Sequence, residues 1–284
     1  MIFAIDISNT TNILAGIFNN NNIELIPNIE FNNIILDINV NIDEIIEYIK
    51  NMADMFFKTC FIKAMVCIPI YYGNIYRKAI ITAGNKINLK INLITNITAL
   101  AIGRDYIYNN CKTYNLLVID TFNKNKTIIS VKEYIYEIIY MGDENFIPPT
   151  DILINETIYF EYNSDLSIIG TILSTTTNIY FMEITSFSFG IWGNKNYDII
   201  FPPHIAFPVI KKIPVVFRNT NDNFNCGVYI KENEIQKLWE IIPDKPLVLP
   251  GMVSYWYFDL LLEIDINGII NGQLIYNDDS RLNN

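Results

Sequence analysis

The chain has 284 residues, of which 51% are hydrophobic, and its formal net charge is −10. This length and composition predict one large or two modest domains with a real hydrophobic core. The acidic balance excludes a broad nucleic-acid-binding surface, because affinity for phosphate backbones comes from clustered Lys and Arg. The four cysteines, Cys60, Cys67, Cys111 and Cys226, lack the spacing of a zinc site or a disulfide framework, so reduced thiols are expected.

Two apolar segments near the start of the chain predict strands, from Phe3 to Ile7 and from Ile13 to Phe18. The first residues, MIFAIDIS, have no basic region and include Asp6, so we expect no signal peptide. The most apolar later segment, Tyr255 to Ile266, is too short and too acidic to cross a membrane.

The apolar spacing then changes to a helical period. A helix is predicted from Ile42 to Phe57, with Asn41 as its N-cap. Its buried stripe is expected to comprise Ile42, Ile45, Ile46, Ile49, Met52, Ala53 and Phe56.

The stretch from Ala64 to Gly103 predicts two strands that alternate with two helices. A strand from Met65 to Ile68 precedes a helix whose apolar stripe is Ile75, Ala79, Ile80 and Ala83, with Arg77 off the stripe. A second strand, from Leu89 to Ile94, precedes a helix that Thr98 could cap. This order is typical of an α/β unit.

The same stretch resembles the nucleotide-binding domain of the seventy-kilodalton heat-shock chaperones. The segments that carry the resemblance are Ala64 to Tyr72, Tyr76-Arg77, Ala79 to Leu89, and Ile94 to Gly103. A glutamate that helps to hold the metal and the attacking water in active members is replaced here by Asn96.

The resemblance also assigns two degenerate phosphate loops. The first comprises Asp6, Ser8, Asn9 and Thr10, and the second begins at Asp120; Leu166 to Gly170 would be a remnant of the strand and turn that contact adenosine. Both loops lack the glycines that let the backbone approach a phosphate closely, and the family's lysine has no counterpart. We therefore expect no catalytic residue, no metal and no cofactor, although bound, uncleaved ATP remains an open alternative.

From Thr185 onward, short apolar runs between turn residues predict an all-β domain. It resembles the β-sandwich peptide-binding domain of the same family. The resemblance implies a partner-binding groove lined by Phe187, Phe189, Ile191, Phe217, Val228 and Ile230. The competing interpretation is that these side chains form the core of the sandwich. The turn Asp265 to Gly268 is expected to join two strands, because a calcium loop would need a distal glutamate.

These observations together predict an α/β plus all-β chain. Residues 1–183 would form a truncated actin-like (ribonuclease-H-like) ATPase-type domain, and residues 184–284 a β-sandwich without a helical lid. Ser8-Asn9-Thr10 and the segment Phe207 to Lys212 are most similar to the atypical, non-catalytic subunit of the ribosome-associated complex, the partner of the J-protein zuotin.

This resemblance implies a chaperone-like scaffold in the cytoplasm that binds a zuotin-like J-protein. It would reach the ribosome indirectly through that partner, assist nascent polypeptides, and touch neither nucleic acid nor membrane directly. A diverged ATP-dependent chaperone remains the alternative function, and a sugar kinase is disfavoured by the β-rich segment after Thr185.

Overall fold

The computed structural model divides the chain into two compact units, Met1–Ile184 and Thr185–Asn284. This division lies one residue from the predicted domain boundary. The structure describes residues 2–8, 13–27, 38–108, 113–121, 123–160, 165–176, 178–185, 188–193, 196–218, 227–231, 235–240 and 255–276. Within these ranges the fold is mixed α/β, with four helices and a larger number of strands.

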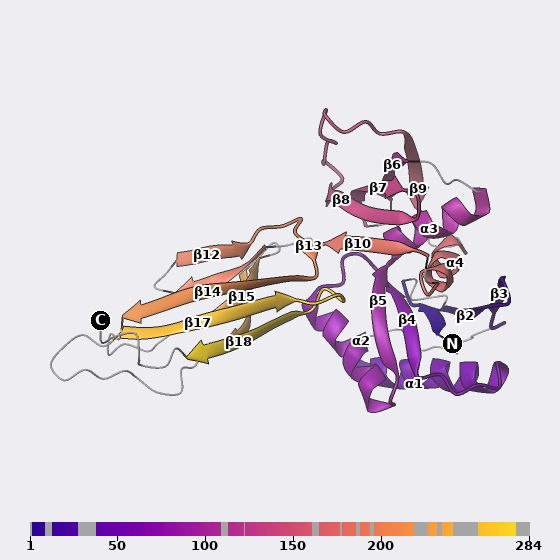
Figure 1. Cartoon of the computed structure of the whole chain (residues 1–284), viewed down its shortest axis with the longest axis horizontal. Helices are drawn as coiled ribbons and strands as arrows, with labels where there is room; N and C mark the ends of the chain where they lie inside the picture. Colours follow the sequence, from indigo (N-terminus) through magenta and orange to yellow (C-terminus); the bar gives the residue numbers. More distant parts are fainter. Residues whose placement is uncertain are drawn as a thin grey trace. The chain divides into compact units, whose positions relative to one another are not determined.

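The first sheet of the N-terminal unit has the strand order β3-β2-β1-β4-β5 (Figure 1). Its strands are β1 (Phe3–Asp6), β2 (Leu14–Asn19), β3 (Asn22–Leu25), β4 (Lys63–Ile68) and β5 (Lys90–Thr95). Strands β1, β2 and β3 form an antiparallel meander, whereas β4 and β5 run parallel to β1. The strands predicted at β1, β2, β4 and β5 are therefore confirmed, with ends shifted by at most two residues.

Helices cover both faces of this first sheet. Helices α1 (Ile38–Phe56) and α2 (Asn74–Lys86) bury one face, where Phe3 and Ile5 of β1 join a large core. Ala4, which points to the opposite face because side chains alternate along a strand, packs against Ile168 and Ile172 of α4 (Leu166–Leu173).

Several details of the helix predictions are wrong. Helix α1 starts at Ile38, so Asn41 lies inside it and is not its cap. Phe56 is 49% exposed and Ile75 is 64% exposed, although both were assigned to buried stripes. Arg77, which was placed off the stripe, is buried because it meets a carboxylate inside the unit.

The second sheet repeats the arrangement of the first. Its strands in this unit are β6 (Tyr114–Asp120), β7 (Asn125–Lys132), β8 (Ile135–Asp143), β9 (Glu156–Phe160) and β10 (Tyr180–Ile184). Strands β6, β7 and β8 form an antiparallel meander, and β9 runs parallel to β6. The order β8-β7-β6-β9 thus matches β3-β2-β1-β4, while β10 adds to β8 on the other side.

Helices α3 (Asn96–Tyr108) and α4 cross closely between the two sheets. A β-carbon at Gly103 would collide with the carbonyl oxygen of Leu166, and one at Gly170 with that of Ala99, so only glycine allows this approach. The interpretation of 166–170 as a strand and turn is therefore wrong, because the segment is helical. Thr98 lies within the first turn of α3, where its hydroxyl is 3.0 Å from that of Thr95.

Two antiparallel sheets make up the C-terminal unit, with orders β12-β11-β15-β16 and β14-β17-β18. The strands of these two sheets are β11 (Ser188–Gly193), β12 (Asn196–Phe201), β14 (Val209–Arg218), β15 (Gly227–Lys231), β16 (Ile235–Glu240), β17 (Tyr255–Ile264) and β18 (Ile270–Tyr276). The two-residue strand β13 (Ala206–Phe207) belongs to neither sheet. Side chains of both sheets form one core, which includes Phe201, Leu260 and Leu262.

The predicted turn after β17 is confirmed. The Asp265 carboxylate accepts hydrogen bonds from the N–H groups of Asn267 and Ile269, each at 2.9 Å, and Gly268 adopts a φ of 70°. Asp265 therefore serves the turn itself. The apolar segment Tyr255 to Ile266 comprises β17 and the first two residues of this turn, and no described helix is long and apolar enough to span a bilayer.

Candidate functional site

The first candidate carboxylate, Asp6, is engaged by its own chain. It ends β1, where its side chain is 4% exposed. One carboxylate oxygen accepts the Ser8 N–H at 2.8 Å, and the other accepts the hydroxyl of Ser167 from α4. Helix α4 therefore supplies a donor at the place where a metal-bound water would have to approach. Asn9 and Thr10 lie outside the described residues.

Cys67 at the end of β4 completes this polar cluster. Burial, and next the neighbouring Asp6 carboxylate, raise the pKa of the Cys67 thiol well above its ordinary value. Hydrogen bonds with Thr171 and Ser8 act in the opposite direction but are weaker causes. The thiol is therefore neutral and a poor nucleophile near neutral pH.

The second candidate carboxylate, Asp120, is also engaged. It ends β6 at 1% exposure, and its two oxygens accept hydrogen bonds from the backbone N–H of Asn123 at 2.9 Å and from Asn123 Nδ2 at 2.8 Å. The next residue, Lys124, has a φ of 56° and pairs with Glu144 at 3.5 Å on the surface. The predicted phosphate loop is thus a tight turn between β6 and β7 that Asp120 holds together.

Asn96 opens helix α3 and is fully buried. Its Oδ1 accepts the Ile70 N–H at 3.1 Å, which fixes the second residue after β4. Its Nδ2 has no hydrogen-bond partner among the described residues. Because an amide is neutral, Asn96 brings no charge into this buried space.

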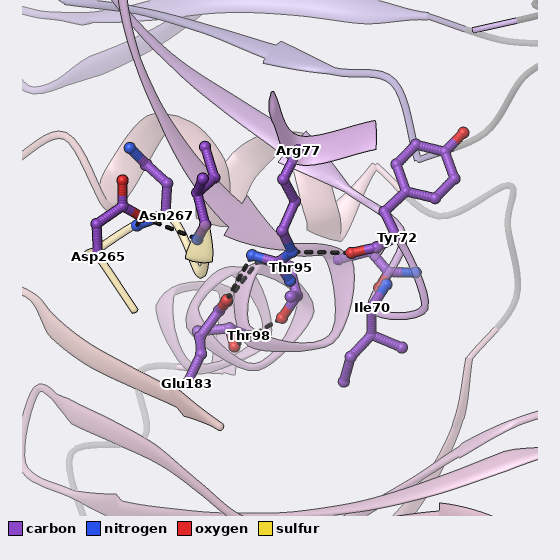
Figure 2. Close-up of polar contacts among 10 residues, drawn as sticks. Ile70, Tyr72, Arg77, Thr95, Thr98, Glu183, Asp265 and Asn267 are labelled. Carbon is purple, nitrogen blue, oxygen red and sulfur yellow. Dashed lines mark hydrogen bonds and ion pairs between the residues drawn. The ribbon is translucent and has the colours of Figure 1, made fainter. Parts of the chain in front are cut away.

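A buried ion pair that the sequence did not indicate joins helix α2 to β10 (Figure 2). Glu183 of β10 accepts the Thr95 N–H at 2.6 Å and lies 3.9 Å from the guanidinium of Arg77. Arg77 also donates from Nε to the carbonyl oxygen of Tyr72 at 2.8 Å. Since Glu183 and Arg77 are 3% and 7% exposed, each charge depends on the other for compensation.

A second buried cluster, also missed, joins α3 to the second sheet. Asp105 accepts hydrogen bonds from Arg104 at 3.1 Å, from Tyr136 at 3.1 Å, and from Tyr114. Arg104 also pairs with Glu156 of β9. Burial is the largest cause that raises the pKa of Asp105, against these hydrogen bonds, which lower it. No sequence motif links the two α3 residues to Tyr114, Tyr136 and Glu156, because these three partners come from three different strands.

The predicted groove residues lie in different settings. Phe189, Ile191 and Val228 belong to the shared core of the C-terminal unit, with exposures of 1%, 8% and 0%. This agrees with the core interpretation and leaves these three side chains unavailable to a partner in this structure. Phe187 and the side chains of Phe217 and Ile230 lie outside the described residues.

The described residues contain no group of three or more His, Cys, Asp or Glu side chains that could hold a metal ion. The candidate site is therefore a set of buried polar groups at the ends of β1, β4, β5 and β6, which are hydrogen-bonded within the chain except for Asn96 Nδ2. No protein-family model matches the chain, and a search of curated proteins finds no match to its sequence either.

Proposed function

We propose that this chain is a non-catalytic, chaperone-like scaffold that binds and stabilises a zuotin-like J-protein at the ribosome. The observation that carries the proposal is the state of Asp6 and Asp120. Each carboxylate is buried, and each accepts hydrogen bonds from donors of its own chain. Phosphoryl transfer needs a free metal-holding carboxylate, phosphate-cradling amides and a positioned water in one place.

The topology supports assigning the N-terminal unit to a reduced actin-like, ribonuclease-H-like fold. The order β3-β2-β1-β4-β5 and its partial repeat, β8-β7-β6-β9, are what two related halves of such a fold would leave. The C-terminal unit, with two sheets around one core, suits a β-sandwich of the peptide-binding type.

The proposed setting is the cytoplasm, with the ribosome reached through the J-protein. The net charge of −10 opposes direct binding to ribosomal RNA, whose phosphates would repel the chain. Nascent polypeptides are then the indirect beneficiaries of the complex. The competing function, a diverged ATP-dependent chaperone, requires a nucleotide pocket that Ser167 and Asn123 now help to fill.

Two measurements on the purified chain test the proposal. We expect co-purification with a J-protein of the same cell, no ATP hydrolysis above background, and no stimulation of hydrolysis by a J-domain. Asn96→Glu should remain inactive, because Asp6 and Asp120 stay engaged. A J-domain-stimulated turnover that Asp6→Asn abolishes would establish the competing function instead.

A further inference from the structure

The two sheets of the N-terminal unit differ at one edge. In the first sheet, β5 lies beyond β4 and runs parallel to it. In the second sheet, β9 is the counterpart of β4, since it runs parallel to β6 as β4 does to β1. The described residues place no strand beyond β9, at the position that corresponds to β5.

Backbone geometry identifies which groups of β9 face this edge. The Asn115 N–H donates to Asn155 Oδ1 at 2.8 Å, and the Asn115 carbonyl accepts the Asn155 N–H at 3.0 Å, so Asn115 faces the β9 side. Backbone groups alternate along a strand, which makes Leu117 face the same side. Leu117 is in register with Thr157, and in a parallel pair it then bonds to the residues that flank Thr157. Along β9 the N–H groups of Thr157 and Tyr159 consequently point away from β6, whereas the N–H of Asn155, which precedes the strand, points toward it.

Side chains do not protect this edge. Exposed edge strands are normally guarded by lysine, proline or other charges, as β14 is by Lys211, Lys212 and Pro214. The sequence of β9, ETIYF, has one charge, Glu156, which Arg104 holds. Tyr159 is 65% exposed and Leu153, just before the strand, is 72% exposed, so apolar surface flanks the edge.

We propose that β9 is a docking edge for an extended segment of a partner protein, which adds parallel to β9 as β5 adds to β4. The first sheet indicates the occupant: about five uncharged residues with apolar side chains at alternate positions, like Ile91 and Leu93 of β5. The inference rests on the proposed scaffold function and names where the J-protein attaches. It also places the attachment away from Phe189, Ile191 and Val228, whose side chains are in a core.

Two variants of one exposed residue test the edge. Thr157→Ala and Thr157→Pro both remove the side chain, but only proline removes the outward N–H, and proline is tolerated on an edge strand whose N–H faces solvent. Binding of the purified J-protein is measured by titration calorimetry. We expect Thr157→Ala to bind like the unchanged chain and Thr157→Pro to bind about tenfold more weakly. The complex should also slow hydrogen exchange at the Thr157 and Tyr159 amides of the unchanged chain.

The outcomes separate the two proposals. Equal affinities of the two variants, with no protection of these amides, would overturn the docking edge while the scaffold function stands. If the unchanged chain does not bind the J-protein, the scaffold function fails and this inference falls with it. If circular dichroism shows that Thr157→Pro does not fold, hydrogen exchange at these amides of the unchanged chain decides alone. Protection in the complex supports the docking edge, and its absence overturns it.

Discussion

The two sheets of the N-terminal unit share a strand order but differ in completeness. The first has five strands, with α1 and α2 on one face and α4 on the other. The second keeps the meander and the parallel β9 but has no described strand at the position of β5. Several contacts join the two halves: the crossing of α3 and α4, the ion pair of Glu183, and the Asp105 cluster. The second sheet is thus held to the first by buried polar groups and by close helix packing.

The largest expected effect comes from separating the two halves at the helix crossing. In Gly170→Ala, the new β-carbon would meet the carbonyl of Ala99, so the helices must move apart. We expect a loss of about 3 kcal/mol of unfolding free energy, measured by urea denaturation. Gly142→Ala is the matched control, since its β-carbon would meet only the Phe146 side chain, in a loop. Equal effects of the two variants would contradict a tight crossing.

Breaking the buried ion pair should be nearly as severe. Glu183→Ala removes the carboxylate that lies 3.9 Å from the buried Arg77 guanidinium and that accepts the Thr95 N–H, which should cost about 3 kcal/mol in urea unfolding. The double variant Arg77→Met with Glu183→Gln should recover much of this loss, because no charge is then left unpaired. A double variant as unstable as the sum of both single changes would contradict this coupling.

A smaller, pH-dependent effect is expected at Asp105. Burial raises its pKa above the ordinary value of 3.8, so the folded chain holds this proton more tightly than the unfolded chain. The contribution of Asp105 to stability is therefore fully present below that ordinary pKa and falls as pH rises through the raised value. The free energy of unfolding of Asp105→Asn, measured with urea between about pH 4 and pH 7, should therefore lack this fall. An unchanged pH profile would show that Asp105 titrates alike in both states.

The smallest effects are expected from surface ion pairs, one in each half. Lys86 pairs with Asp43 in the first half and Lys124 with Glu144 in the second, and all four side chains are about half exposed or more. Lys86→Ala and Lys124→Ala should each change stability by less than about 0.5 kcal/mol, because water screens such pairs. A larger loss only at Lys124 would indicate that the shorter half relies on its surface turn.

Periodicity predicted much of the fold, because burial of one helix face or of a whole strand leaves a local pattern. Helix α1 and strands β1 and β4 follow from such patterns. Burial of Arg77 did not follow from the sequence, because its partner, Glu183, comes from a distant strand. The segment 166–170 was misassigned because a short apolar run fits a strand or a helix equally well.

The candidate site was predicted in part. The positions of Asp6 and Asp120 at strand ends follow from the apolar runs before them. That Ser167 and Asn123 donate hydrogen bonds to these carboxylates did not follow, because a single hydroxyl or amide carries no sequence signature. The contact of Asn123 was nearer to being predictable, since turns often contain an aspartate that accepts hydrogen bonds from residues just after it.

The contrast between Cys60, which is exposed, and the buried Cys67 gives the protein an internal reporter. A thiol reagent that labels Cys60 at once can reach Cys67 only after β1, β4 and α4 have come apart. The rate at which Cys67 is labelled therefore reports how often the N-terminal unit opens. A bound partner or nucleotide that stabilises the closed unit would lower this rate.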